Sequence, residues 1–197
     1  MASQEGSNPI RNDRREQILR AALQVFSRKG IIETKMSMVA EKARISKGLL
    51  YNYFTSKDEL FTTLVELALS ESHRTMTYAY MLPGRPIEKI RVLTEMILAE
   101  GDGTYFMLIH QARTSDETPE KVKELLKQYS MDTYVDELLP IFLKGQQAGE
   151  IIDIEPRKLI AGYLSVISGL MLLGIPEDGH FQQPDADLIL RMIASNQ

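Results

Sequence analysis

The chain has 197 residues, of which 44% are hydrophobic and 25% charged, and it contains no cysteine. That length suits one globular unit or two small ones, and the lack of cysteine excludes disulfide scaffolds, zinc–thiolate sites and thiol nucleophiles. The net charge of −4 is unevenly spread, because residues 1–58 hold 11 basic and 6 acidic residues while the remainder holds 12 and 21, so we expect only the N-terminal head to meet a polyanion.

Apolar residues that recur every three or four positions predict helices throughout the chain, and strand patterns are absent. The first helix is expected to begin at about Asp13 and to end at Gly30, a residue suited to a helix C-terminus. Two short helices follow, one over about 37–43 and one from Ser46 onward. Because such short helices are unstable alone, they must pack on the first.

A capping box, Ser56-Lys57-Asp58-Glu59, begins the helix that joins the basic head to the acidic body without a Gly/Ser linker. Later helices are expected over about 86–100 and 104–113, over 118–149 with a kink or split at Pro140, over about 155–174, and after Pro184. The sequence therefore predicts an all-α fold of about nine helices.

The longest apolar stretch, Leu159 to Leu173, is interrupted by small and polar residues. We expect it to fall short of the ~18–20 residues that span a bilayer. The polar start, Met1 to Asn8, lacks the basic and apolar regions of a secretory signal. The expectation is a soluble, cytoplasmic protein without a membrane partner.

Two short helices separated by a tight turn and braced by a preceding helix form the helix-turn-helix pattern, whose second helix enters the major groove of DNA. Lys47 can pair with a phosphate or a guanine, and Asn52 offers a donor and an acceptor to a base edge. Gly48 allows the main chain to approach closely. Tyr51 and Tyr53 can bind the DNA backbone or, alternatively, pack against the first helix.

Between Arg14 and Leu60 the chain carries Ile18-Leu19-x-Ala21-Ala22, Val39-Ala40, Ser46-Lys47-Gly48, Leu50-Tyr51-x-Tyr53-Phe54 and Lys57-x-Glu59-Leu60. This series resembles the DNA-binding domain of the TetR family of repressors. The resemblance implies a flexible segment over 1–12, a three-helix helix-turn-helix domain over 13–56, and a helical ligand-binding and dimerisation domain over 57–197. Carried over by position, the DNA-binding residues are Thr34, Ser37, Ser46, Lys47, Gly48, Tyr51, Asn52, Tyr53 and Lys57.

Two positions depart from the family's pattern. Arg44 stands at the turn position that usually holds glycine, where a left-handed residue other than glycine costs ~1–2 kcal/mol. Either this turn is built differently, or the strain is tolerated and Arg44 adds a phosphate contact. Lys35 stands where a hydroxyl residue commonly caps the second helix, so we expect the cap at Thr34 or Ser37.

A single short recognition helix reads only a few base pairs, so we expect a homodimer that binds a palindromic operator in double-stranded DNA. Small residues recur every four positions in the helix near 156–173, which allows a second helix to approach closely. Burial within one chain is the alternative. The expected interface residues are Ala161, Ser165, Gly169, Leu172, Leu188, Ile189 and Met192.

The resemblance also implies a small-molecule effector that binds in the helical body and releases the operator. The candidate lining residues, each of which could instead be ordinary core, are Met96, Glu100, Phe106, His110, Gln111, Tyr129, Met131, Tyr134 and Tyr163. A DNA-binding regulator without an effector and a helical ligand-binding protein that no longer reads DNA stay open. Hydrolase, phosphate-loop and zinc-protease motifs are absent, so we expect no enzyme, cofactor or metal.

Overall fold

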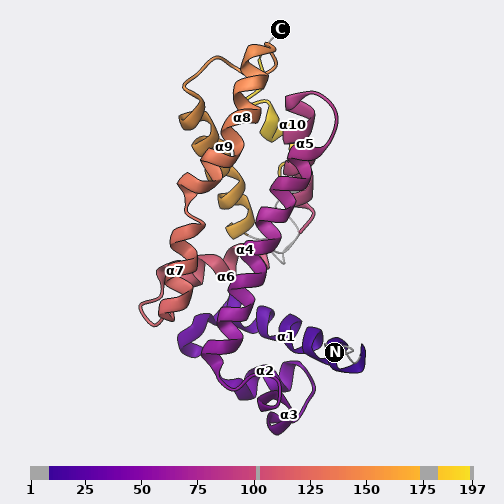
Figure 1. The fold of residues 1–197 in the computed structure, drawn as a ribbon, viewed down its shortest axis with the longest axis vertical. Helices are drawn as coiled ribbons and strands as arrows, with labels where there is room; N and C mark the ends of the chain where they lie inside the picture. The colour runs from indigo at the N-terminus through magenta and orange to yellow at the C-terminus, as the bar shows by residue number, and fades with distance from the viewer. Residues whose placement is uncertain (1–8, 101–102, 174–181, 196–197) are drawn as a thin grey trace, which may run out of the picture. The chain divides into compact units, whose positions relative to one another are not determined.

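The computed structural model describes residues 9–100, 103–173 and 182–195. These residues form helices joined by turns, with one isolated β-bridge between Ile151 and Ala194. The predicted all-α class is confirmed. The helices, labelled in Figure 1, are α1 (Pro9–Glu33), α2 (Met36–Lys42), α3 (Lys47–Tyr51), α4 (Lys57–Met81), α5 (Pro86–Leu98), α6 (Thr104–Thr114), α7 (Glu120–Gln128), α8 (Met131–Gln147), α9 (Pro156–Leu173) and α10 (Ala186–Leu190).

The chain divides into two compact units. The first comprises Met1–Ala68 and Leu108–Lys123, and the second comprises Leu69–Met107 and Glu124–Gln197. The helices α4, α6 and α7 therefore each supply residues to both units. The domain boundary expected between residues 56 and 57 stays a prediction.

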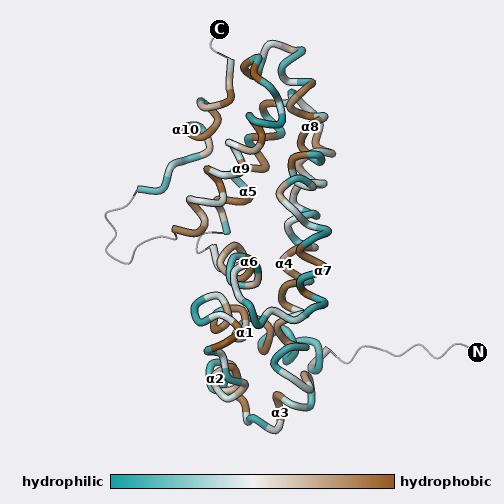
Figure 2. The backbone as a smooth tube through the Cα atoms, turned by 90° about the vertical axis from the view of Figure 1, so that its left-hand side faces the viewer, coloured by the Kyte–Doolittle hydropathy of each residue, from teal (hydrophilic) through white to brown (hydrophobic). Residues whose placement is uncertain are grey.

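The core of the first unit is built on α1 and the start of α4. The rings of Phe26 and Phe61 lie 5.1 Å apart between centroids, and Leu50 of α3 and Phe54 are buried with them in the unit. Along α4, hydrophobic and hydrophilic residues alternate, as Figure 2 shows. Because α2 and α3 have seven and five residues, this packing is what keeps them helical.

α1 differs from expectation at its start and agrees at Gly30. It begins at Pro9, so the cap expected at Asp13 is wrong. The backbone leaves helical geometry at Gly30, with φ 69° and ψ −179°, where the helix was expected to end. A β-carbon added to Gly30 would lie 2.8 Å from Oε1 of Gln111, so glycine is required there by space as well as by its positive φ.

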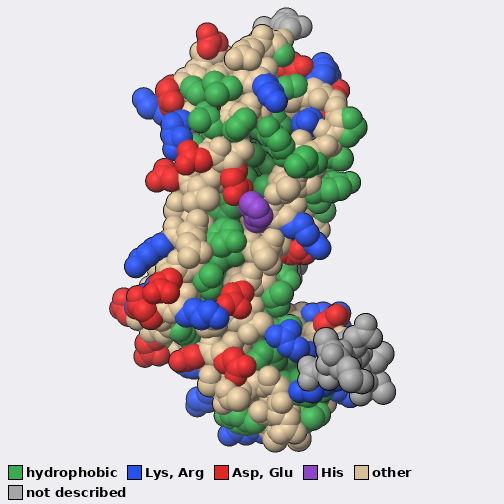
Figure 3. Space-filling model, in the orientation of Figure 1, with side chains coloured by type: hydrophobic (Ala, Val, Ile, Leu, Met, Phe, Trp, Pro, Cys, Tyr) green, Lys and Arg blue, Asp and Glu red, His purple; other side chains and the backbone are tan. Residues whose placement is uncertain are grey.

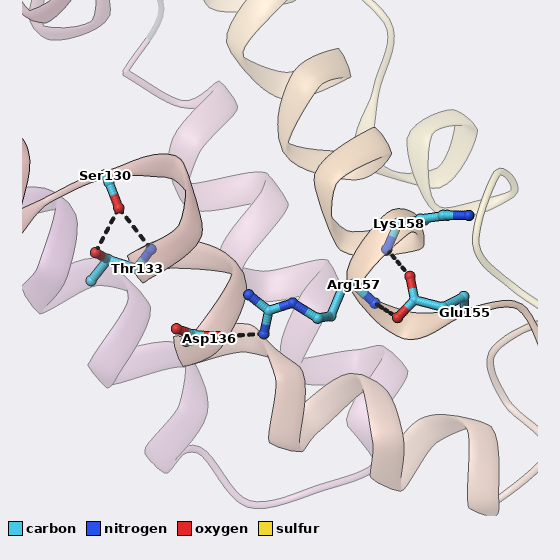
Figure 4. A network of polar contacts seen from close by, with 6 residues as sticks. All are labelled: Ser130, Thr133, Asp136, Glu155, Arg157 and Lys158. Carbon is cyan, nitrogen blue, oxygen red and sulfur yellow. Dashed lines mark hydrogen bonds and ion pairs between the residues drawn. The ribbon is translucent and has the colours of Figure 1, made fainter.

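The core of the second unit lies between α5, α8 and α9. The ring of Phe142 lies 5.9 Å from that of Tyr163, and the Tyr163 hydroxyl is within 2.8 Å of Oγ1 of Thr94. Figure 4 shows the polar contacts at the ends of α8 and α9, including the ion pair between Arg157 and Asp136. This ion pair joins the two helices at their surface, whereas the Ser130–Thr133 and Glu155–Lys158 contacts lie within the first turns of α8 and α9.

Of the kink or split expected at Pro140, the split is not present. α8 runs through Pro140, and the break from α7 lies at Tyr129 and Ser130. Oγ of Ser130 accepts a hydrogen bond from the N–H of Thr133 at 3.2 Å and thereby begins α8 (Figure 4).

α9 contradicts one expectation drawn from its length. It has 18 residues and is, by length and composition alone, apolar enough to cross a membrane. Four of its residues are buried, seven are half-buried and seven are exposed. Among the exposed residues, Leu172 and Leu173 at its end are the large apolar ones.

Candidate nucleic-acid interface

The turn between α2 and α3 is built on a left-handed residue other than glycine. The N–H of Ile45 donates to the carbonyl of Ala40 at 3.0 Å. The N–H of Arg44 donates to the carbonyl of Glu41 at 2.9 Å. These paired bonds form a Schellman motif, in which Arg44 takes φ 53°. Of the two alternatives, the structure therefore shows the tolerated strain of ~1–2 kcal/mol, with the Arg44 side chain exposed.

The side chain of Gln17 makes two hydrogen bonds, one of which links α1 to this turn. Nε2 of Gln17 donates to the carbonyl of Ala43, the last residue before the turn, at 2.7 Å. Oε1 of Gln17 in turn accepts from Nη1 of Arg14 at 2.7 Å. The half-buried Gln17 therefore holds the end of α2 against α1, which fixes the direction in which α3 leaves the turn.

α3 buries one face and exposes the other. Ser46 caps the helix, because its Oγ accepts from the N–H of Leu49 at 3.1 Å. Leu50 is fully buried. The exposed residues on and beside α3 are Ser46, Lys47, Gly48, Tyr51 and Asn52.

The exposed side chains of α3 are ordered among themselves. The Lys47 ammonium lies 5.8 Å from the centroid of the Tyr51 ring, a cation–π arrangement one turn apart. Asn52 caps the C-terminus of α3, and the next residue, Tyr53, is half-buried. The surface thus offers ammonium, hydroxyl and carboxamide groups, the types that bind phosphates and base edges.

Two side chains expected at phosphates are engaged inside the protein. Thr34 is 2% exposed, and its hydroxyl donates to the carbonyl of Gly30 at 2.6 Å. Nζ of Lys57 donates to the carbonyl of Ile31 at 2.7 Å. Because carbonyls at a helix end lack helical partners, both side chains complete the end of α1 in this geometry and are not held out toward DNA.

The start of α2 also differs from expectation. Lys35 is the residue before the helix, and its side chain makes no capping hydrogen bond. The cap therefore does not move to Thr34, whose hydroxyl is committed to α1. Ser37 is exposed in the first turn and stays available to a phosphate.

The residues expected at a dimer interface divide between surface and core. Leu188 is 54% exposed and Met192 53%. Ile189 is 2% exposed and packs in the core of its own unit, so its side chain faces inward. The others are Ala161, half-buried, and Ser165, Gly169 and Leu172, exposed.

Of the residues expected to line an effector pocket, Tyr163 alone lines one of the two cavities described below, both formed by residues that the structure describes. Tyr163 lines a cavity of about 200 Å³ beside α10, together with Ile189 and Met192. Burial raises the pKa of Tyr163 to about 12, against the opposing hydrogen bond from Thr94. A second cavity, formed by described residues of α4, α5 and α8, includes none of the predicted residues.

The remaining candidates have other environments. Gln111 lies beside Gly30 in the first unit. Phe106 and Tyr134 pack against the core of the second unit. Met96 and Tyr129 are half-buried, and Glu100, His110 and Met131 are exposed.

Comparison with known proteins agrees with the helix-turn-helix geometry. Residues 18–64 match the family model described as bacterial regulatory proteins, tetR family. The chain is 28% identical over 182 residues to YfiR, an uncharacterized HTH-type transcriptional regulator of Bacillus subtilis, which covers 90% of this chain and 86% of that protein.

Two solved structures show the same fold. A TetR-like transcriptional regulator from Rhodococcus sp. RHA1 has a TM-score of 0.68 at 23% identity, with 91% of this chain and 92% of that chain covered. AibR in complex with isovaleryl coenzyme A and operator DNA has a TM-score of 0.66 at 20% identity, with 90% and 94% covered. The solved structures agree with this chain in fold, and the family match over the helix-turn-helix leads to one assignment: residues 18–64 form a DNA-binding domain of the tetR family of bacterial regulatory proteins.

Proposed function

We propose that the chain is a cytoplasmic, homodimeric repressor that binds a palindromic operator and is released from it by a small-molecule effector. The observation that carries the DNA-binding part is the exposed face of α3, with Lys47 and Asn52, on a head whose basic residues outnumber its acidic ones. In this arrangement Asn52 contacts a base edge, and Lys47 and Arg44 contact phosphates.

The apolar surface of α9 and α10 supports the homodimer. Leu173, Leu188 and Met192 are each more than half exposed. At Gly162 and Gly169 an added β-carbon would meet nothing within 4 Å, so a second helix has room to approach there. Burying this face against its copy around a twofold axis covers α9 and places two reading heads on half-sites ~34–36 Å apart, or a multiple of it.

Effector control is supported by the course of α4. Its residues up to Ala68 belong to the first unit and those from Leu69 to the second, so a ligand that shifts the second half acts on the same helix that supplies the head. AibR, with the same fold, has been solved with both an acyl-coenzyme A and operator DNA. The coupling equals the ligand's preference for the non-binding geometry, typically ~1–3 kcal/mol.

The DNA-binding proposal is tested with the purified protein on the duplex upstream of its own gene and on a scrambled duplex, across a salt series. We expect tight binding to the native duplex and a large specificity ratio. Asn52→Ala should lower the difference in binding free energy between the two duplexes by ~1–3 kcal/mol. Lys47→Ala should weaken binding to both duplexes and reduce the slope of log affinity against log salt. Lys144→Ala, which removes an exposed charge of α8, is the control.

Unchanged binding by the Lys47 and Asn52 variants would show that α3 does not read DNA. The dimer is tested separately by sedimentation. Leu188→Glu should shift the chain toward monomer, whereas Ile32→Glu, at an apolar residue 58% exposed on α1, should not. Equal sedimentation of the two variants would place the interface elsewhere.

A further inference from the structure

A groove of about 240 Å³ lies between α4, α5 and α8 within the second unit. Figure 3 shows apolar side chains exposed among charged ones on the face where Figure 1 presents these helices. The apolar lining includes Met76, Ala79, Ile90, Leu93, Leu138 and Ile141. The titratable lining residues are His73, Tyr80, Lys89, Asp136 and Glu137.

Both carboxylates of the groove already have cationic or polar partners. Asp136 forms an ion pair with Arg157 of α9. Oε1 of Glu137 lies 3.0 Å from Nδ1 of His73, which links α8 to α4. The negative charges of the lining are therefore engaged, and a cationic ligand would have to displace an existing partner.

Lys89 is in a different position. Nζ donates to the carbonyl of Tyr80 at 3.0 Å and lies 5.7 Å from the centroid of the Tyr80 ring. None of the ion pairs among the described residues includes Lys89. An ammonium has three N–H donors, so one is used at the end of α4 and two are free for an anion.

The chemistry of the lining around Lys89 limits which ligands can bind in the groove. Pro140 lines the groove and lacks an N–H, so the carbonyl of Asp136 cannot receive the usual helical hydrogen bond from it. That wall offers acceptors and apolar carbon, and Lys89 is the charged lining residue that forms no ion pair with another described residue. Pockets with apolar walls and a single charged group orient amphipathic ligands by the head group.

We propose that this groove is the effector site and that it binds a small amphipathic monoanion, a carboxylate with an aliphatic tail. The carboxylate binds Nζ of Lys89, and the tail lies along Met76, Ile90 and Ile141. The ligand thereby contacts residues of α4 between His73 and Tyr80, in the half of that helix that belongs to the second unit. Its action on DNA rests on the proposed function, whereas its binding does not.

The experiment is calorimetric titration of the full-length protein, without DNA, with three probes that share one tail: octanoate, octanol and octylamine. We expect octanoate to bind about tenfold or more tightly than octanol, and octylamine to bind most weakly. Lys89→Met, which keeps the aliphatic stem, should lower the octanoate affinity about ten- to a hundredfold and leave that of octanol unchanged.

Matched variants separate binding from folding. Lys89→Arg should keep octanoate binding, and Lys144→Met, at an exposed lysine outside the groove, should not affect it. Thr77→Trp at the exposed rim should fill the groove and weaken octanoate and octanol alike, with a tryptophan reporter of folding in a chain that has none.

Three results would overturn the inference: no octanoate binding, equal octanoate affinity in wild type and Lys89→Met, or octylamine binding as tightly as octanoate. Adding octanoate to the protein–operator complex then tests the effector role. Octanoate that binds at Lys89 without changing operator affinity would overturn that role alone. Specific operator binding without octanoate binding would refute the groove as an anion site and leave the DNA-binding function intact.

Discussion

Replacing Arg44 with glycine should raise fold stability and lower DNA affinity. At φ 53° a side chain with a β-carbon costs ~1–2 kcal/mol, a strain that glycine does not bear. Glycine gives back ~0.4–1 kcal/mol through the greater freedom of the unfolded chain. The hydrogen bonds of the turn join backbone atoms, so they are kept when the Arg44 side chain is removed. Arg44→Gly should therefore raise the free energy of unfolding by about 1 kcal/mol.

Arg44→Ala is the matched comparison, because alanine removes the guanidinium and keeps the β-carbon. Its free energy of unfolding should stay within about 0.5 kcal/mol of wild type, as for most exposed substitutions. Both variants lose the same exposed charge. If Arg44 contacts one phosphate, each should reduce the slope of log affinity against log salt by about 0.9.

Urea unfolding and duplex binding over a salt series measure the two effects independently. Equal unfolding free energies for the glycine and alanine variants would refute the stored strain. A salt slope unchanged from wild type in both would refute the phosphate contact and leave Arg44 without a part in DNA binding.

Three further outcomes are expected from buried or half-buried groups. Lys57→Met should lower the free energy of unfolding in urea by about 1–3 kcal/mol, because the carbonyl of Ile31 loses a charged donor; an unchanged value would show that this bond is not needed. Gly30→Ala should lower it by more than ~1–2 kcal/mol, and adding Gln111→Ala should recover only the part due to crowding. Because burial raises the pKa of Tyr163 to about 12, the unfolded state ionises first, and stability should fall above about pH 10 by up to ~3 kcal/mol. Tyr163→Phe should lack this extra loss in unfolding measured against pH, and parallel curves would contradict burial as its cause.

Residue types and their spacing predicted those parts of the nucleic-acid interface that depend on residues close together in the sequence. The cap at Ser46 and the break at Gly30 follow from the residue types and their spacing, and both are present. Lys57 differs because its partner is a carbonyl at the break in α1, 26 residues away; the acceptor of Thr34 is only four residues away, but the bond depends on the same break. A spacing rule within one helix does not contain that information.

The second unit shows the same limit in another form. Ser130 caps the start of α8 through Thr133, whereas a kink or split was expected from the sequence at Pro140. Pro140 is exposed, so the helix loses one bond there without burying an unpaired group. The groove was not predictable, because Lys89 and its other lining residues come from three helices and carry no shared spacing.

The exposed apolar residues at the end of α9 and beside α10, namely Leu172, Leu173, Leu188 and Met192, make stability depend on protein concentration if they form the dimer interface. If a second copy covers the helix, the apparent stability follows mass action and rises with chain concentration. Diluted below the dissociation constant of the dimer, each chain would present α9 to water as an aggregation-prone surface and would lose the second reading head at the same moment. A regulator kept at a few copies per cell therefore depends on a dimer tight enough that dilution at cell division does not open it.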